Sequence, residues 1–366
     1  MSTTSSITPR AESDGVKPSV PDRSGRQHVG IGQIASRYGL LSLALVLVIA
    51  FSLLLPKTFP TSTTALAILD AQAVIAMLAL AETIVVIVGE FDLSVGFLIG
   101  LSHILVLSFI VKNGMPWGLA VVLVIAIGLF VGLVNGLLVH VAKIDSFIAT
   151  LGLGTIIYSI SNWYTSSQQV TGKLPKGFLR IYSTKPFGIP ISAVYVLGLL
   201  LVLWTVLEFT PTGRYLYALG GNRRAAELTG ISSRRYVIGA FMAAGAIVAL
   251  AGVVLASRLQ VADVGNGPDY LLPTFVGAML GSTTIKPGRA NPAGTIVAVL
   301  VLGIGIAGFQ QIGGSTYFIV PLFNGTTLIV GVGLAGYASR RVRHVRPQAV
   351  TAALVDTDRP PESADL

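Results

Sequence analysis

Glu90, Asp92 and Ser94 lie close together in the stretch GEFDLSVG (89–96), which apolar runs flank on both sides. Ionisable groups at membrane depth are costly, and they usually face a cavity, a substrate path or a partner. These three side chains are therefore candidates for a translocation path. The alternative is a turn in which Asp92 caps the following helix, because Asp is favoured at N-caps and stabilises the positive helix end.

Amide side chains inside apolar runs form a second group of candidates. Asn135, Asn162 and Gln310 could line a path, or each could hydrogen-bond between helices. His103 and His140 lie in different apolar runs without metal-ligand spacing, so no metal site is expected. The chain has no cysteine, which excludes a disulfide framework and a thiolate zinc site.

A third group of candidates lies in the long polar stretch 211–235, PTGRYLYALGGNRRAAELTGISSRR. Asn222 is a plausible N-cap and Gly230 a plausible C′ residue, which predicts a short helix at about 221–230. So short a helix is marginal in water and must be held from outside. Ala226 and Gly230 share one face, which suits insertion into a groove on another protein. The alternative is an ordinary loop between membrane spans.

Several catalytic signatures are missing from the sequence. It contains no GxxxxGK[ST] phosphate loop, no GxSxG or HExxH motif and no kinase signature. We therefore expect no enzyme activity and no cofactor in this chain. If ATP drives the protein, another chain carries the ATPase.

Composition defines the broad class. Of the 366 residues, 53% are hydrophobic and 11% are charged, against about 25% charged in a soluble domain. The mean hydropathy is +0.77. These values predict an all-α integral membrane protein in a lipid bilayer. The net charge of +9 comes largely from residues beside apolar runs, where it reads as a topology signal rather than nucleic-acid binding.

Apolar runs of spanning length predict about ten transmembrane helices. They are 38–55, 65–88, 93–111, 117–141, 146–163, 189–209, 236–256, 271–285, 292–309 and 318–337. The eighth is short and could be tilted, re-entrant or half-length. Lysines and arginines concentrate in the segments that become cytoplasmic when both termini are inside. We expect a transmembrane domain at 37–340 between cytoplasmic tails at 1–36 and 341–366.

The segment 164–188 is then a long external loop with four basic residues, two glutamines and Pro175. It is a candidate docking site for an extracytoplasmic partner. It could equally be a solvated connector.

Several of these motifs resemble the ribose-type permease family of bacterial ATP-binding-cassette (ABC) importers. In that family the first motif usually reads GGIDLSVG and the second GG-N-x-x-A-A-x-x-x-G-I. LVNGLLV (133–139), FIATLG (147–152) and, more loosely, GRANPAGT (288–295) also fit the pattern. The positions that match the family's coupling-helix motif are Gly220, Gly221, Asn222, Ala225, Ala226 and Gly230, with Arg224 and Glu227 inside it.

The resemblance implies a ten-helix permease with a cytoplasmic coupling helix that docks into an ATPase. It also implies the partners: two cytoplasmic ATPases that hold ATP and Mg, an extracytoplasmic substrate-binding protein, and a second permease subunit, identical or related. The implied location is the inner membrane.

The sequence departs from the family at a few positions. Arg224, preceded by Arg223, stands where a Glu usually precedes the two alanines. Two cations at a helix N-terminus oppose its dipole, so we expect an acidic surface on the ATPase. Glu90 and Phe91 replace Gly and Ile, and Pro268 and Pro273 interrupt an apolar stretch.

Three hypotheses for the function follow. The first is a sugar importer permease for ribose, a xylose-like monosaccharide or a polyol. The second keeps the importer but carries branched-chain amino acids or nucleosides. The third is a proton-coupled carrier in which Glu90 and Asp92 relay protons.

Overall fold

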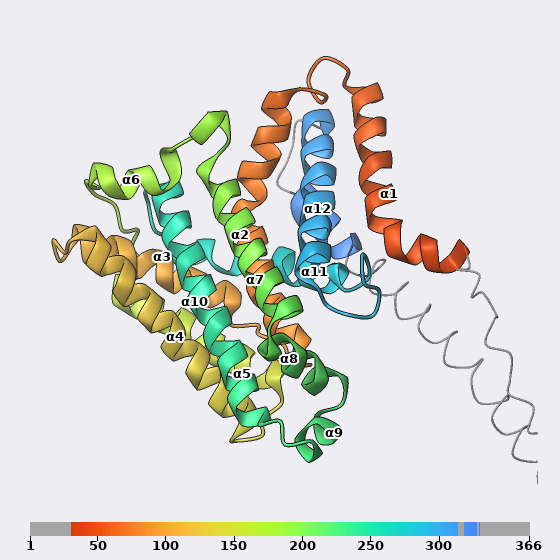
Figure 1. The fold of residues 1–366 in the computed structure, drawn as a ribbon. Coiled ribbons are helices and arrows are strands. Elements are labelled where there is room, and N and C mark those ends of the chain that lie inside the picture. Colours follow the sequence, from red (N-terminus) through yellow and green to blue (C-terminus); the bar gives the residue numbers. More distant parts are fainter. Residues whose placement is uncertain (1–30, 314–317, 328, 330–366) are drawn as a thin grey trace, which may run out of the picture.

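A computed structural model describes residues 31–313, 318–327 and 329 of the chain, and these residues are almost entirely helical (Figure 1). The only pairing of extended segments within them is one bridge between Val170 and Ala262. The α-helices are α1 (Ile31–Leu54), α2 (Ser62–Ile87), α3 (Val95–Val111), α4 (Trp117–His140), α5 (Ser146–Thr165), α6 (Lys176–Ser183), α7 (Ile191–Phe209), α8 (Pro211–Gly221), α9 (Arg223–Leu228), α10 (Ser233–Leu259), α11 (Leu271–Gly281) and α12 (Pro292–Gly313). Short 3-10 turns lie at Pro186–Gly188, Val264–Asn266 and Pro268–Tyr270.

Local sequence signals set several helix ends. Thr61 and Asp145 accept hydrogen bonds from backbone N–H groups at the starts of α2 and α5. Pro211 occupies the first turn of α8, where its missing N–H costs nothing. Gln260 ends α10 in the left-handed conformation with φ of 58°.

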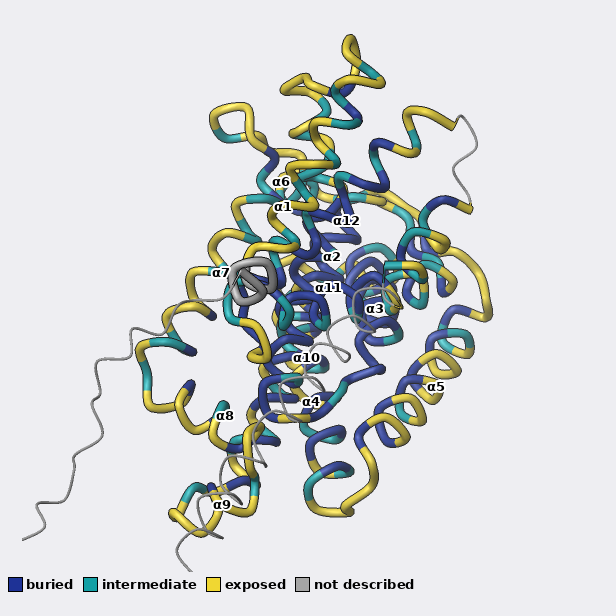
Figure 2. The backbone as a smooth tube through the Cα atoms, turned by 90° about the vertical axis from the view of Figure 1, so that its right-hand side faces the viewer, coloured by how far each residue is buried: buried dark blue, intermediate teal, exposed yellow. Residues whose placement is uncertain are grey.

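Helix α10 lies at the centre and packs against α4, α3 and α2, while α12 packs against α2, α11 and α1 (Figures 1 and 2). Glycines allow the α4–α10 crossing. A Cβ on Gly132 would lie 2.2 Å from the carbonyl oxygen of Phe241, and one on Gly128 would lie 2.4 Å from that of Gly245. Such small-residue contacts bring helix backbones together where lipid provides no hydrophobic drive.

The predicted spans agree with the helices over most of the chain. Helices occupy each of the first nine predicted spans, and residues 319–327 begin the tenth, whose remainder lies almost wholly outside the described residues. Within the described ranges, five helices are long and apolar enough to cross a membrane: α2, α4, α7, α10 and α12. The eighth predicted span contains α11, which has only 11 residues and is about half the length that a bilayer needs.

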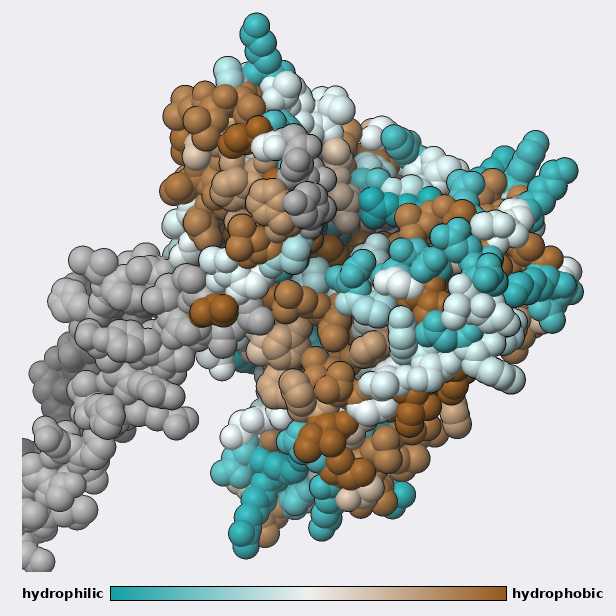
Figure 3. All heavy atoms as spheres, turned by 180° about the vertical axis from the view of Figure 1, so that it is seen from behind, coloured by the Kyte–Doolittle hydropathy of each residue, from teal (hydrophilic) through white to brown (hydrophobic). Residues whose placement is uncertain are grey.

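The surface also fits a membrane environment. Large apolar side chains are exposed on several outer helices, including Leu53, Val122, Phe130 and Val202. Seen from behind, apolar side chains cover broad areas and polar ones gather toward the margins (Figure 3). An integral helical membrane protein is the class these surfaces indicate.

The segment 164–188, predicted as a docking site or a connector, folds onto the bundle through α6. Phe178 is fully buried, and its carbonyl accepts a hydrogen bond of 2.9 Å from the Ser257 hydroxyl. Asp70 of α2 accepts hydrogen bonds from the hydroxyls of Tyr182 and Ser192. Burial, and then the hydrogen bond to Asp70, raises the pKa of Tyr182 to about 12, so this phenol keeps its proton and donates. The segment is therefore folded against the helical bundle, and we call it the α6 cap.

Candidate functional site

The helix predicted at about 221–230 is α9. The Asn222 side chain accepts a hydrogen bond of 3.0 Å from the Ala225 N–H, and Gly230 has a φ of +87°. Both predicted end residues therefore act as expected, as an N-cap and as a left-handed residue past the helix. The segment therefore contains a helix, and its role as a docking element or as an ordinary loop between membrane spans stays a prediction.

Helix α8 carries α9 and was not predicted, because residues 211–221 have no clear apolar period. The Thr210 hydroxyl caps it, and Leu216 and Leu219 are buried. Near its C-terminal end, Gly220 meets the end of α2 directly. A Cβ on Gly220 would lie 1.9 Å from the Ile87 carbonyl oxygen, so only glycine allows this contact.

An ion pair joins α9 to the helix break after α2. Nη2 of Arg223 lies 2.7 Å from Oε1 of Glu90 and also donates to the Val88 carbonyl at 3.3 Å. The side chains are 37% and 12% exposed. Glu90 thus balances the charge of Arg223 within the chain. Of these two arginines, only Arg224 is then expected to face the acidic surface that we predicted on the ATPase. Glu90 therefore forms an ion pair with Arg223. Its role in a translocation path stays a prediction.

The exposed face of α9 differs from the predicted one. Ala226 is buried against its own chain, so it cannot enter a groove on another protein, and that prediction is wrong. Arg224, Ala225 and Glu227 are exposed, and the side chain of Leu228 is 84% exposed.

Neighbouring side chains accept hydrogen bonds from the backbone N–H groups of the helix break. The N–H groups of Phe91, Asp92 and Leu93 donate to Ser146 Oγ at 3.2 Å, Glu82 Oε1 at 3.1 Å and Thr150 Oγ1 at 2.9 Å. Each residue of the break therefore has a partner on α2 or α5. Non-helical backbone at membrane depth is tolerated under this condition.

Asp92, Ser94 and Asn135 lie together, fully buried. Asp92 Oδ1 accepts from the Ser94 N–H at 2.9 Å and the Ser94 hydroxyl at 2.6 Å, and Asn135 Nδ2 donates to Ser94 Oγ at 2.8 Å. The N-cap of α3 is Ser94, without a side-chain bond, so the expectation that Asp92 caps this helix is wrong. Asp92 instead closes a turn onto Ser94.

The remaining two path candidates lie elsewhere. Asn162 is half-buried near the end of α5 and donates to its own helix, at the Tyr158 carbonyl. Gln310 is half-buried near the end of α12. The structure therefore groups Asp92, Ser94 and Asn135, places Glu90 beside them in the ion pair, and separates Asn162 and Gln310 from that group.

The outer face of α5 carries a shallow groove. Its lining residues are Gly152, Thr155, Ile156, Ser159, Ile160 and Trp163. Thr155 and Ser159 are exposed there, although each donates its hydroxyl to a carbonyl of its own helix.

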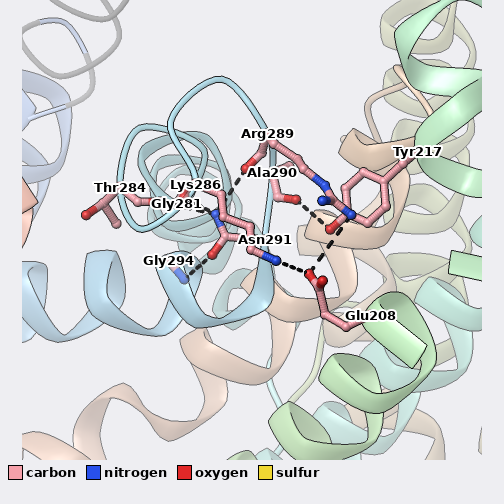
Figure 4. Close-up of polar contacts among 9 residues, drawn as sticks. All are labelled: Glu208, Tyr217, Gly281, Thr284, Lys286, Arg289, Ala290, Asn291 and Gly294. Atoms are coloured by element: carbon pink, nitrogen blue, oxygen red, sulfur yellow. Dashed lines mark hydrogen bonds and ion pairs between the residues drawn. The ribbon is translucent and has the colours of Figure 1, made fainter. Parts of the chain in front are cut away.

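A second set of contacts holds the end of α7 and helix α8 against the loop 282–291 between α11 and α12 (Figure 4). Lys286 Nζ donates to Glu208 Oε1 at 2.5 Å, and Arg289 lies 4.0 Å from the same oxygen. The Arg289 guanidinium also lies 3.5 Å from the centre of the Tyr217 ring. The Tyr217 hydroxyl donates to the Ala290 carbonyl at 2.9 Å, and burial raises the pKa of this phenol, which keeps it a donor.

Asn291 shapes the loop that makes this contact. Its Nδ2 donates to the carbonyls of Gly281, Thr284 and Arg289, and its Oδ1 accepts from the Gly294 N–H at 2.7 Å (Figure 4). One side chain thereby joins the end of α11 to the start of α12. Sequence reasoning noted Lys286 and Arg289 only for topology and did not single out Glu208, Tyr217 or Asn291.

The apolar helical bundle is the architecture of an integral membrane protein, and comparison with known proteins gives the family. The chain belongs to the family described as "Branched-chain amino acid transport system / permease component", whose model matches residues 64–331.

Several curated relatives are sugar import permeases. The chain is 34% identical to the ribose import permease protein RbsC of Bacillus subtilis (strain 168) over 274 residues, which are 75% of this chain and 84% of the relative. It is 31% identical to RbsC of Escherichia coli (strain K12) over 301 residues, 81% of this chain and 92% of the relative. The fructose import permease protein FrcC of Rhizobium meliloti is 29% identical over 286 residues, 75% and 79% of the two chains.

These relatives group the chain with the ribose-type sugar permeases of bacterial ABC importers. No solved structure matches the chain. Within the part of the chain that the structure describes, no three His, Asp or Glu side chains gather as a metal site would require.

Proposed function

We propose that this chain is the permease subunit of an ATP-driven importer that carries a monosaccharide or polyol across the inner membrane. Ribose and xylose-like sugars are the first candidates. The relatives named for ribose, allose and fructose support a sugar as the substrate. The chain itself would hold no cofactor, and ATP and Mg would bind to the partner ATPases.

The observation that carries the proposal is α9, the proposed coupling helix. It is only six residues long, it is capped at both ends, and it displays Arg224 and Leu228 to the outside. An isolated helix of this length is unstable in water, yet Asn222, Arg223 and Gly230 hold it in place. A preformed, exposed helix is suited to dock into a groove on an ATPase with little loss of entropy on binding.

We propose the orientation that places α9 in the cytoplasm and α6 outside. The transmembrane domain would extend over residues 37–340 with ten membrane segments, one of them the half-length α11, and both tails would be cytoplasmic. The cap built by α6 would then face the substrate-binding protein. The groove on α5 would face a second permease subunit, which suits its small and polar residues better than lipid.

Cross-linking from α9 tests the proposal directly, because the chain has no cysteine of its own. Leu228→Cys, labelled with a photoactivatable maleimide in the assembled importer, is expected to cross-link to the ATPase. Phe187→Cys is the matched control, since Phe187 is another highly exposed apolar residue and lies in the turn Pro186–Gly188 that follows α6. Cross-linking of the ATPase through residue 187 and not 228 would overturn the orientation and the docking role.

Uptake measurements separate the three functions. Proteoliposomes with internal ATP, the ATPase and the binding protein are expected to take up ribose or a related sugar, and not leucine or uridine. Preference for leucine or uridine would favour the second hypothesis. Uptake that persists without ATPase and collapses with an uncoupler would favour a proton-coupled carrier.

A further inference from the structure

Two carboxylates that the proposed function does not use are buried in contact with each other. Glu82 of α2 is 1% exposed, and Asp92 of the helix break is 2% exposed. Glu82 Oε1 accepts the Asp92 N–H at 3.1 Å, so both belong to one small polar region between α2, α4 and α5. The side chains that contact Asp92 and the adjoining backbone from these helices are Glu82 of α2, Asn135 of α4 and Thr150 of α5.

The hydrogen bonds to Asp92 indicate that its carboxyl group is ionised. Its Oδ1 accepts from the Ser94 N–H, the Ser94 hydroxyl and Asn135 Nδ2, at 2.9, 2.6 and 3.3 Å. Three donors on one oxygen stabilise the ionised carboxylate. Asp92 therefore carries the negative charge of the pair.

The region has a surplus of acceptors. Glu82 Oε2 and Asn135 Oδ1 are buried and have no hydrogen-bond donor among the described residues. Asn135 cannot be reversed to relieve this, because its Oδ1 would then face the oxygens of Asp92 and Ser94. Both unpaired oxygens belong to side chains whose other polar atoms contact Asp92 or Ser94, so both lie at the same site.

No cation among the described residues forms an ion pair with either carboxylate. The three ion pairs among the described residues involve Glu90 and Glu208, and none involves Glu82 or Asp92. Water can donate hydrogen bonds to the free oxygens, but it supplies no charge. Two unbalanced carboxylates at this depth would cost far more than the local hydrogen bonds return.

We infer that the Glu82–Asp92 site binds one unit of positive charge, either a proton on Glu82 or a sodium ion between the acceptor oxygens. The carboxylate of Asp92, the free Glu82 oxygen and the Asn135 oxygen are hard acceptors suited to either. Asp92 follows Glu90 by two residues, so a shift of α9 acts on this site through the Arg223–Glu90 pair. The site is thereby placed to make the transport cycle sensitive to protons or sodium.

The test uses the purified full-length permease and the variants Glu82→Gln and Glu90→Gln. Gln at position 82 keeps the acceptor for the Asp92 N–H, and the position 90 variant is the control for losing an acidic residue nearby. Thermal unfolding is measured in sodium chloride, potassium chloride and N-methylglucamine chloride at equal ionic strength. If sodium binds, the unfolding midpoints of the wild type and of the Glu90→Gln variant are higher in sodium chloride than in the other two salts. The midpoint of Glu82→Gln is the same in all three salts.

Infrared spectroscopy in sodium-free buffer at neutral pH tests whether Glu82 carries a proton. A protonated buried carboxyl gives a C=O band that Glu82→Gln removes and Glu90→Gln keeps. Asp92→Asn supplies a second variant if Glu82→Gln does not fold, because loss of the Asp92 charge abolishes sodium stabilisation or moves the band. Absence of both the sodium effect and the carboxyl band in the wild type would overturn the inference.

Discussion

Arg223 and Glu90 stand 133 positions apart in the chain, yet Nη2 of one and Oε1 of the other are 2.7 Å apart. Both residues belong to motifs in which the sequence departs from the ribose-type pattern. Glu90 replaces a glycine of the pattern, and its charge is balanced by Arg223, the neighbour of the departing Arg224. The two motifs that identified the family are therefore in physical contact, and one of them carries the proposed coupling helix.

Exchange of the two charges is the first prediction. Glu90→Arg and Arg223→Glu are each expected to lower ATP-driven uptake, because the remaining charge loses its partner and α9 loses its tether. The double variant restores much of the uptake. Since Arg223 is more than a third exposed, we expect a coupling energy of only about 1 kcal/mol. Additive losses in the double variant would show that the pair does not hold α9.

Gly230 provides the second prediction. Its φ of +87° is unfavourable for residues with a Cβ, so Gly230→Val is expected to strain the end of α9 by about 1–2 kcal/mol. Co-purification of the ATPase should fall while the amount of permease in the membrane stays constant. Gly221→Ala is the control, because a Cβ there meets no atom and its φ is not positive. Undiminished co-purification of Gly230→Val would argue against α9 as the docking helix.

The third prediction concerns the contact between Glu208 and the loop before α12. Glu208→Gln removes the charge that faces Lys286 and Arg289, and we expect a loss of stability of about 0.2–1 kcal/mol, since both cations are partly solvated. The effect on uptake should exceed this, because the contact joins the end of α7, immediately before α8, to the loop that precedes α12. Lys286→Met is expected to reproduce the defect. Normal uptake in both variants would limit the contact to a structural role.

The fourth prediction tests the α4–α10 crossing. Gly132→Ala is expected to destabilise the protein by about 1–3 kcal/mol, because its Cβ would collide with the Phe241 carbonyl. Gly118→Ala in the same helix has open space and is expected to be neutral or slightly stabilising. Thermal unfolding in detergent compares the two. Equal midpoints would show that the helices do not approach as closely as described.

Hydropathy and helix-capping residues were sufficient to predict much of the fold from the sequence. The first nine predicted spans contain helices because long apolar runs have few other solutions in a membrane. Asn222 and Gly230 marked the ends of α9 because capping depends on local chemistry alone. Helix α8 was missed, since its stability comes from Leu216 and Leu219 packing on distant segments.

The candidate site was harder to predict. Glu90 and Arg223 were both singled out, but nothing local indicates that they meet, because their contact depends on how α8 crosses the end of α2. The burial of Ala226 and the exposure of Leu228 follow from the same crossing. Glu208 and Lys286 carry no motif, and only the fold brings them together.

Gly220 touches the Ile87 carbonyl with no side chain in between, so no rotamer change can absorb a small displacement of α8. A movement of that helix must either carry the end of α2 along or separate the two segments. A larger residue at position 220 would separate them permanently. In an ATP-driven importer the consequence would be futile hydrolysis, in which nucleotide is consumed at a normal rate while no sugar crosses.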